Sequence, residues 1–339
     1  MATIKEIATL AGVSRGTVDR VLNNRGGVSE ATAKRVQEIA DRLNYKPNRA
    51  GLILAARKKK IKIGVIVFEA SNPFFDDVLA GVHAKAQELD GYNVSLLIRQ
   101  VPFDELAQFN TMEELLAEGI NGLMIAPYNS LYIAAEIDRF TDMGIPVVTT
   151  NSDILSKRIA YVGCNYFLSG QVAAGLVGRM THGNDICVGV ITGSVHVLCH
   201  TERIAGFMDI IKREYSHIQV TEPVENHDND TESYEVVSQL LEKHPEVNVL
   251  FFTAGGVLGG CNAVLDHNRA DSIQIFTYDC VPSTVELIRQ NVICATICQN
   301  PFQQGYLPLH LLVHNLLEKQ KPENELNYTD LSIKIKENL

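Results

Sequence analysis

The chain has 339 residues, of which 46% are hydrophobic and 21% are charged, and its formal net charge is −10. This length is too great for one ordinary domain, and the composition is typical of a soluble globular protein. No run of 18 apolar residues predicts a membrane span, and we expect no signal peptide at the start of the chain. The sequence therefore predicts two or three compact units in the cytoplasm.

The seven cysteines are odd in number, form no C-x-x-C pair and mostly lie in apolar runs. This pattern predicts reduced, mostly buried thiols. Cys294 and Cys298 could form half of a metal site, but their even spacing is better explained by one face of a strand. We expect no metal ion and no other cofactor.

Positive charge is concentrated at the start of the chain. Residues 1–60 contain 13 basic and 5 acidic side chains, a net charge of +8, whereas the remainder carries −18. A basic head on an acidic body is typical of a DNA-binding domain joined to a domain with another role.

Three short helices are predicted in the head. Thr3 and Glu6 form a capping-box pattern, and Gly12 ends that first helix. Ser14 caps the second helix and Ser29 caps the third. Because the first two helices are joined by a very short, glycine-containing turn, the pattern predicts a helix-turn-helix. Its second helix would enter the major groove of DNA by its N-terminal end.

The side chains at the start of the second helix are candidates for DNA contact. Arginine suits bidentate guanine recognition, and threonine or asparagine suits phosphates. The alternative is a small helical bundle with solvated arginines, which the charge distribution and the tight turn make less favourable. The candidates are Arg15, Gly16, Thr17, Arg20, Asn23 and Asn24.

The head also resembles a known family. The patterns I-K-E-I-A-x-x-A-G-V-S-x-x-T-V-x-R-V-L-N over residues 4–23 and L-N-Y-K-P-N over residues 43–48 are similar to the head of the lactose-repressor (LacI/GalR) family. The resemblance implies that Tyr45 and Asn48 contact phosphates. It also implies a hinge helix after Pro47, with Leu54 wedged between central base pairs of the operator.

The head departs from the family pattern at two places. Asp19 stands where serine is usual, four residues from Arg15 on the same helical face. Gly51 and Leu52 stand where alanine and arginine are common, and glycine costs roughly 1 kcal/mol of helix propensity relative to alanine. The hinge is therefore expected to form less readily.

From Ile61 onwards, short β-branched runs alternate with amphipathic stretches such as residues 76–89 and 111–118. This alternation predicts parallel α/β units. A break near residues 161–165 divides the body into two similar, doubly wound lobes. The expected strands are residues 61–68, 93–98, 120–126, 145–150, 185–192, 247–253 and 273–278.

Polar and aromatic side chains follow these strands, where ligands bind in open α/β sheets. Amides, hydroxyls, a carboxylate and aromatic rings suit a polyhydroxylated ligand. Phe74 and Phe75 could instead belong to the core, and Arg203 could form a surface ion pair. Residues of this kind at the strand ends include Asn72, Phe74, Phe75, Tyr128, Asn129, Asn151, Ser152, Ser194 and Asp279.

The body resembles the family's sugar-binding core, which is similar to type I periplasmic binding proteins, especially the ribose-binding branch. The likeness is carried by S-N-P-F-F at residues 71–75, E-R-x-x-G-F at 202–207 and A-T-I-x-Q at 295–299. It implies lobes joined by crossovers near Asn165, Gln299 and Asn324. It also implies ligand contacts by Asn72, Phe74, Phe75, Asn151, Arg203, Asp279 and Gln299.

The body, too, departs from the family pattern. Asn151 and Ser152 stand where Asp-Arg is common, and Ala254 and Gly255 stand where Asn-Asp is common. These positions have lost charged and amide groups, so the sequence does not identify the sugar.

The predicted organisation has four parts. Residues 1–48 form the helix-turn-helix domain, and residues 49–60 form the hinge helix and basic linker. The first lobe takes residues 61–164 plus 300–324, and the second takes residues 165–299 plus 325–339.

The predicted function is a sugar-responsive repressor that binds operator DNA as a homodimer. A non-sugar polar metabolite as effector, a solute-binding protein of a transporter and an enzyme are the alternatives. The sequence contains no nucleophile elbow, no H-E-x-x-H and no P-loop, so no catalytic residue is expected.

Overall fold

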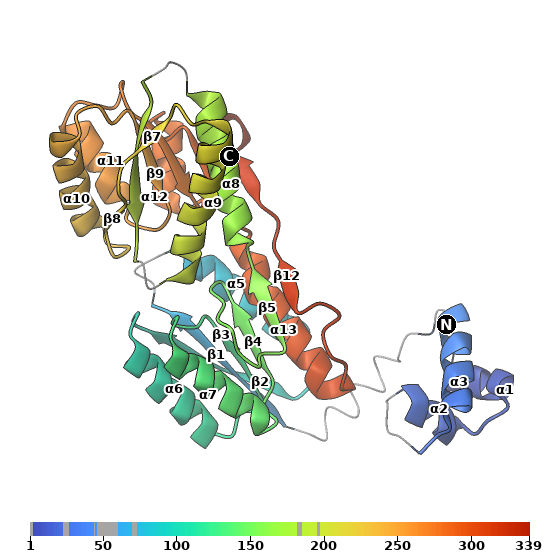
Figure 1. Cartoon of the computed structure of the whole chain (residues 1–339). Helices are drawn as coiled ribbons and strands as arrows, with labels where there is room; N and C mark the ends of the chain where they lie inside the picture. The colour runs from blue at the N-terminus through green and yellow to red at the C-terminus, as the bar shows by residue number, and fades with distance from the viewer. Residues whose placement is uncertain are drawn as a thin grey trace.

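The computed structural model describes residues 3–22, 27–43, 45, 60–69, 73–181, 185–194 and 197–339. The predicted hinge helix and most of the basic linker, residues 49–59, lie outside this described part. Five predicted contact residues also lie outside the described part, namely Asn23, Asn24, Asn48, Leu54 and Asn72. The described residues form a helical head and two α/β lobes (Figure 1).

Helices α1 (Ile4–Ala11), α2 (Arg15–Leu22) and α3 (Glu30–Arg42) form the head. Thr3 and Glu6 cap α1 through a capping box, as the sequence predicts. The hydroxyl of Ser29 caps α3 by accepting a hydrogen bond from the N–H of Thr32. A side-chain cap of this kind is worth about 0.5–2 kcal/mol to a helix.

The turn between α1 and α2 fixes the geometry of the head. Gly12 ends α1 in the left-handed conformation, with a φ of 65°, which glycine adopts without steric cost. Ile7, Val18 and Val36 come one from each helix and are fully buried in a single cluster. The short turn and the shared core confirm the helix-turn-helix prediction.

The described part of the first lobe contains a parallel sheet in the order β12-β5-β4-β3-β1-β2. Helices α5 (Phe74–Glu88) and α13 (Pro301–Glu318) pack on one face of the sheet. Helices α6 (Glu105–Ala117) and α7 (Leu131–Asp142) pack on the other. The strands are β1 (Ile61–Phe68), β2 (Val94–Val101), β3 (Gly122–Ile125), β4 (Val147–Thr150), β5 (Ala160–Gly163) and β12 (Leu326–Tyr328).

The second lobe repeats this plan with the order β13-β11-β10-β9-β6-β7, and β8 also pairs with β6. Helices α8 (Tyr166–Met180) and α9 (Leu198–Glu214) cover one face. Helices α10 (Asp230–Lys243), α11 (Val257–Asp266) and α12 (Pro282–Arg289) cover the other. The strands are β6 (Cys187–Thr192), β7 (Gln219–Val220), β8 (Val224–Glu225), β9 (Val249–Phe252), β10 (Gln274–Tyr278), β11 (Ala295–Cys298) and β13 (Ser332–Lys334).

Two helix pairs use glycine to bring their backbones together. On α9, a Cβ atom at Gly206 would overlap the carbonyl oxygen of Phe167 on α8, and one at Gly170 on α8 would overlap that of Arg203. The first lobe has the same reciprocal arrangement between α5 and α13, at Gly81 and Gly305. The close α8–α9 contact holds the turn of helix that carries Arg203 against the inner end of α8.

The chain crosses between the lobes three times, after β5, after β11 and between β12 and β13. The first two crossings lie beside Asn165 and Gln299, as expected. The third lies at residues 329–331, beyond the predicted position near Asn324, because β12 pairs in parallel with β5. The predicted boundary between residues 324 and 325 is therefore corrected, since 326–328 belong to the first lobe.

The cysteines differ in part from the prediction. Cys280 and Cys298 are paired as a disulfide, with Cα atoms 6.1 Å apart, so the expectation of seven reduced thiols is wrong for this pair. The pairing arises because β10 and β11 lie side by side and end in register near these residues. The other five cysteines are free and are buried or half-buried. No helix in the described part of the chain is long and apolar enough to cross a membrane.

Candidate functional site

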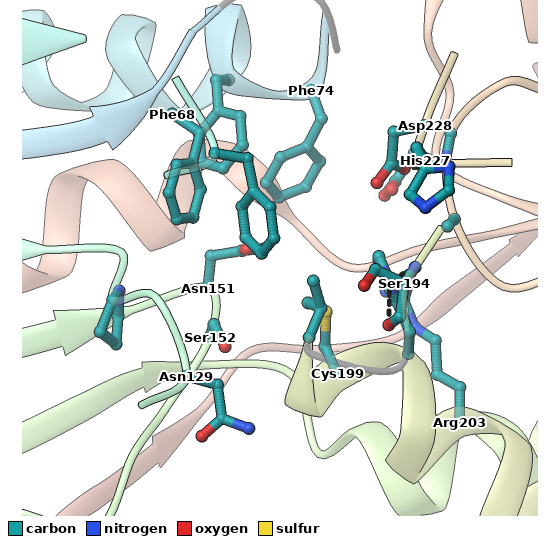
Figure 2. A pocket seen from close by; sticks show the side chains of 18 of the residues that line it. Phe68, Phe74, Asn129, Asn151, Ser152, Ser194, Cys199, Arg203, His227 and Asp228 are labelled. Carbon is teal, nitrogen blue, oxygen red and sulfur yellow. Dashed lines mark hydrogen bonds between the residues drawn. The ribbon is translucent and has the colours of Figure 1, made fainter. Parts of the chain in front are cut away.

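The two lobes enclose a cavity of about 180 Å³ at the carboxyl ends of their strands. Drug-sized ligands fill pockets of about 300–1,000 Å³, so this space suits a smaller molecule. The first lobe contributes mainly aromatic rings and amides, whereas the second contributes charged and imidazole side chains. Figure 2 shows Phe68 and Phe74 across the cavity from His227 and Asp228.

The aromatic wall is formed by Phe68, Phe74, Phe75 and Phe103. Phe74 and Phe75 are only 3% and 6% exposed and pack in the first-lobe core, with their ring centroids 5.3 Å apart. They therefore belong to the core and also line the cavity. Tyr128 does not line it, and its ring packs against Phe103 with the centroids 4.8 Å apart.

Arg203 lies on the first turns of α9 and points into the cavity (Figure 2). Its side chain is not at the surface, since the residue is only 3% exposed. Nη1 donates to the carbonyl of Thr253 at 2.5 Å, and the guanidinium lies over the ring of Tyr278 at 3.8 Å. Nε and Nη2 meet no acceptor among the described residues. Buried, unpaired N–H groups in a cavity are suited to an oxygen-rich ligand.

Asp279 follows β10 and has a left-handed backbone, with a φ of 66°. Gln299 donates from Nε2 to both of its carboxylate oxygens, at 3.1 and 3.0 Å. Burial raises the pKa of Asp279 to about 6, although the charge of Arg203 and the hydrogen bond from Gln299 act in the opposite direction. A carboxylate held in this way accepts hydrogen bonds from hydroxyl groups.

Asn151 connects the first-lobe wall to the crossovers. Its Nδ2 donates to Oε1 of Gln304 at 3.3 Å, and Gln304 in turn donates from Nε2 to the carbonyl of Gln299 at 2.9 Å. Gln304 is fully buried at the start of α13. A chain of hydrogen bonds thus runs from Asn151 in one lobe to Asp279 in the other.

The second lobe supplies polar side chains that the sequence analysis did not identify as contacts. His200 lies on α9, and its Nδ1 accepts the N–H of Ser194 at 3.1 Å. Burial lowers the pKa of His200, which favours the neutral imidazole. Asp228 follows β8 and lies beside Gly255. Asp228 was missed because the short strand β8 was not recognised, so the loop after it was not considered.

The structure therefore brings together six of the eight predicted ligand contacts. These are Phe74, Phe75, Asn151, Arg203, Asp279 and Gln299. Lining residues that had not been proposed as contacts include Phe68, Glu69, Phe103, Cys199, His200, His227 and Asp228. Among the described residues, no group of His, Cys, Asp or Glu side chains could hold a metal ion.

The second helix of the head presents the predicted DNA contacts at its surface. Arg15, Gly16 and Arg20 are exposed, and Thr17 is half-exposed. The hydroxyls of Ser14 and Thr17 are 2.9 Å apart, which fixes the N-terminal end of α2. Tyr45 is half-buried in the head cluster, and burial raises its pKa, with a smaller contribution from the charge of Asp19.

Comparison with known proteins assigns both parts of the chain. Residues 3–48 match the family described as bacterial regulatory proteins, lacI family. Residues 63–321 match the family described as periplasmic binding protein domain.

Whole-length relatives and solved structures agree with these matches. The chain is 27% identical over 335 residues to the ribose operon repressor of Haemophilus influenzae, covering 98% of this chain and 95% of that protein. It is 26% identical to the ribose operon repressor of Bacillus subtilis, with 94% and 93% covered. A glucose-galactose binding protein from Geobacillus stearothermophilus matches 83% of this chain and 99% of its own, with a TM-score of 0.76 and 25% identity. The chain therefore belongs to the family with a periplasmic binding protein domain, which forms its body, and its head is a domain of the lacI family of bacterial regulatory proteins.

Proposed function

We propose that this protein is a transcriptional repressor whose affinity for operator DNA is set by a sugar bound between the two lobes. The observation that carries the proposal is the buried guanidinium of Arg203, which faces the interlobe cavity with Nε and Nη2 unpaired. A polyhydroxylated molecule supplies the oxygen atoms that these groups lack and the donors that Asp279 accepts. The relatives named ribose operon repressor support the same reading.

The head binds the operator through α2 in the major groove. Arg15 and Arg20 lie exposed on this helix, and Gly16 leaves its N-terminal end open, since an added Cβ would meet only Ser14 Oγ at 3.6 Å. The residues that the sequence assigns to the hinge, Asn48 and Leu54, would add phosphate and minor-groove contacts. We place the protein in the cytoplasm, where operator DNA is found.

We further propose a homodimer in which the first lobes pair through the edge of the first sheet. Among the described strands of this sheet, β2 lies at one edge, and its residues Leu96 and Ile98 are half-exposed. A groove lined by His83, Ala86, Leu89, Val94, Leu96 and Ile98 runs beside it. An apolar strand edge is suited to pairing with a second copy. A two-fold dimer also places two heads on a pseudo-palindromic operator.

An enzyme is not favoured, because the polar groups of the cavity are held in positions suited to binding. Nδ1 of His200 is occupied by the backbone of Ser194, and Asp279 is held by Gln299. Cys199 also lines the cavity, but burial raises the pKa of its thiol to about 12. Such a thiol is not a nucleophile at neutral pH.

Selection of a high-affinity site from a random duplex library, followed by fluorescence anisotropy with and without sugars, tests the proposal. We expect nanomolar binding to one pseudo-palindromic sequence and a sugar-dependent change in that affinity. The Arg15→Ala/Arg20→Ala double variant is the control and should select no sequence. Selection of unrelated sequences by the wild type, or no response to any sugar, would contradict the proposal. Sedimentation of a monomer that retains full operator affinity would contradict the dimer.

A further inference from the structure

Two consecutive residues at the rim of the cavity have a backbone conformation that L-amino acids rarely adopt. His227 and Asp228 have φ values of 48° and 56°. Non-glycine residues in this region cost of order 1–3 kcal/mol each, and such strain concentrates at ligand-binding sites. The surrounding structure holds both residues in place: the N–H of His227 donates to the carbonyl of Gly193 at 3.0 Å, and the N–H of Asp228 donates to Oδ1 of Asn226 at 3.1 Å.

This strained turn directs the side chain of Asp228 into the cavity (Figure 2). Oδ1 accepts the N–H of Gly255 at 2.5 Å. Oδ2 lies above Gly193, where an added Cβ would come within 2.5 Å of it, and an added Cβ at Gly255 would be 2.8 Å from Oδ1. Asp228 can therefore occupy this place only because both neighbouring positions are glycine.

A donor and an acceptor remain available at this place. No described residue donates a hydrogen bond to Oδ2 of Asp228. The ring of His200 also lies above Gly193, since a Cβ there would be 2.6 Å from its Cε1. Nδ1 of His200 lies 3.1 Å from the backbone nitrogen and 3.3 Å from the carbonyl oxygen of Ser194. In the tautomer in which Nδ1 accepts from that N–H, Nε2 carries the proton and is a donor. A ligand hydroxyl can accept from this donor and donate to the carboxylate.

The charges around the cavity limit the ligand further. Glu69, Asp228 and Asp279 are carboxylates, whereas Arg203 is the one Lys or Arg in the described lining. Arg203 alone would attract a phosphate or a carboxylate, but such a group would lie in the same small cavity as three acidic side chains. The negative charge of such a group and those of the carboxylates would repel each other strongly in a cavity from which water is excluded. An uncharged polyol satisfies both the unpaired guanidinium and the carboxylates.

We propose that Asp228 is a specificity residue of this pocket and restricts the effector to uncharged polyhydroxylated molecules, excluding phosphorylated and carboxylated sugars. This inference rests on the proposed function, since it assumes that the interlobe cavity is the effector site. A purely structural role for Asp228 would consist of accepting the Gly255 N–H through Oδ1. Asparagine can perform that role, so Asp228→Asn separates the two roles.

Calorimetry on the full-length protein tests the inference with matched pairs: D-ribose and D-ribose 5-phosphate, D-glucose and D-glucose 6-phosphate, D-galactose and D-galacturonate. We expect the wild type to bind at least one uncharged sugar and to bind its charged counterpart at least 30-fold more weakly. In Asp228→Asn, the Kd of that uncharged sugar should rise about tenfold or more, because a charge-assisted hydrogen bond is lost. The ratio of the Kd of the charged sugar to the Kd of the uncharged sugar should also fall.

Two further variants control for indirect effects. Glu222→Gln removes one negative charge from an exposed position of the same lobe and should change neither Kd. Gly255→Ala keeps the charge of Asp228 but displaces its carboxylate, so it should weaken the uncharged sugar while the discrimination against its charged counterpart persists. Thermal unfolding of each variant verifies that it is folded.

Three results would overturn the inference. They are tighter binding of a charged sugar than of its parent, an unchanged Kd in Asp228→Asn, and no binding of any uncharged sugar. Operator binding is not part of this measurement. A protein that binds sugars as expected but never changes its operator affinity would contradict the proposed function and leave the role of Asp228 supported.

Discussion

The side-chain amide of Gln299 donates from Nε2 to both carboxylate oxygens of Asp279, at 3.1 Å to Oδ1 and 3.0 Å to Oδ2. Asp279 directly follows β10 and Gln299 directly follows β11, and these strands are parallel neighbours. Gln299 also lies at the crossover into α13. A side chain that would bind the effector is thus held by a residue through which the two lobes are connected.

Replacement of Arg15 and Arg20 tests whether α2 contacts bases and phosphates in the major groove. Arg15→Ala should weaken binding to the selected operator by about 1–3 kcal/mol and relax base preference at one position, if the arginine is bidentate to guanine. Arg20→Ala should weaken binding, and loss of a phosphate contact should also lower the salt slope by roughly 0.9. Mobility shifts against single-base operator variants at several salt concentrations measure both effects.

The control for these variants is Arg35→Ala, which removes one exposed positive charge from α3 of the same head. It should change operator affinity only through general electrostatics and leave base preference intact. Equal operator affinity of the wild type, Arg15→Ala and Arg20→Ala would show that α2 does not read the groove.

Asp279 makes the stability of the unliganded protein depend on pH. Its pKa is raised from 3.8 to about 6, so the folded protein holds this proton more tightly than the unfolded chain does. Ionising the carboxyl therefore costs folding free energy as the pH rises above 3.8, and the cost is complete above about 6. Asp279→Asn should be more stable than the wild type at pH 7.5, and this advantage should shrink at pH 4.5.

Urea unfolding at the two pH values measures this difference. Asp271→Asn, which removes an exposed carboxylate from the same lobe, is the matched control. The same substitution at Asp279 should weaken sugar binding, because an amide replaces the carboxylate that accepts the hydroxyl donors. An advantage for Asp279→Asn that is equal at both pH values would show that the carboxyl is not destabilised by burial.

How far the sequence predicts this structure depends on the length of each element. The helices of the head are predictable from the sequence, because caps such as Thr3 and Ser29 and the terminator Gly12 are local signals. Long buried strands such as Ile61–Phe68 were also predicted, since a run of apolar residues between turns is unambiguous. The strands β7 and β8 have only two residues each and carry no periodic signal, so tertiary pairing alone defines them.

The candidate site was predictable where chemistry follows a recognised strand, as for Asn151 and Asp279. It was not predictable at Asp228, because that residue follows the unrecognised β8. From the sequence alone, Ala254 and Gly255 predict a loss of polar groups from this part of the pocket. The structure corrects this, since the carboxylate of Asp228 occupies the space that the absent side chain at Gly255 leaves open. Compensation between positions 27 residues apart cannot be read from either position alone.

The disulfide between Cys280 and Cys298 should stabilise the second lobe. It closes a loop with a sequence separation of 18, for which the loss of chain entropy in the unfolded state predicts about 3 kcal/mol. The Cys280→Ser/Cys298→Ser variant should therefore unfold at a lower temperature than the oxidised wild type. A reductant should lower the Tm of the wild type to the same degree and leave the double variant unaffected.

The control is Cys294→Ser, which alters a free thiol beside β11 and should keep the response to reductant. A wild type whose Tm does not respond to reductant would contradict the stabilising role.

Effector binding should close the two lobes, and this motion should act as the switch. Candidate contacts come from both sides, with Phe74 and Asn151 in the first lobe and Arg203 and Asp279 in the second. A ligand that touches both lobes binds the closed form better, so it shifts the equilibrium towards that form. Small-angle scattering should show a smaller radius of gyration in the presence of a binding sugar, and Asp279→Ala should abolish this change.

The closure should be coupled to DNA, because the head precedes β1 of the first lobe along the chain and movement of paired first lobes in the proposed dimer would change the spacing of the two heads. This coupling is reciprocal: saturating sugar must change operator affinity by the same factor as saturating operator changes sugar affinity.

Gln304→Leu breaks the hydrogen-bond chain from Asn151 to Gln299 without removing a residue of the cavity lining. It should therefore reduce this factor more than it reduces sugar affinity. Titrations of sugar with and without operator measure the factor from both directions. A sugar that binds without changing either the radius of gyration or the operator affinity would show that the cavity is not linked to the head.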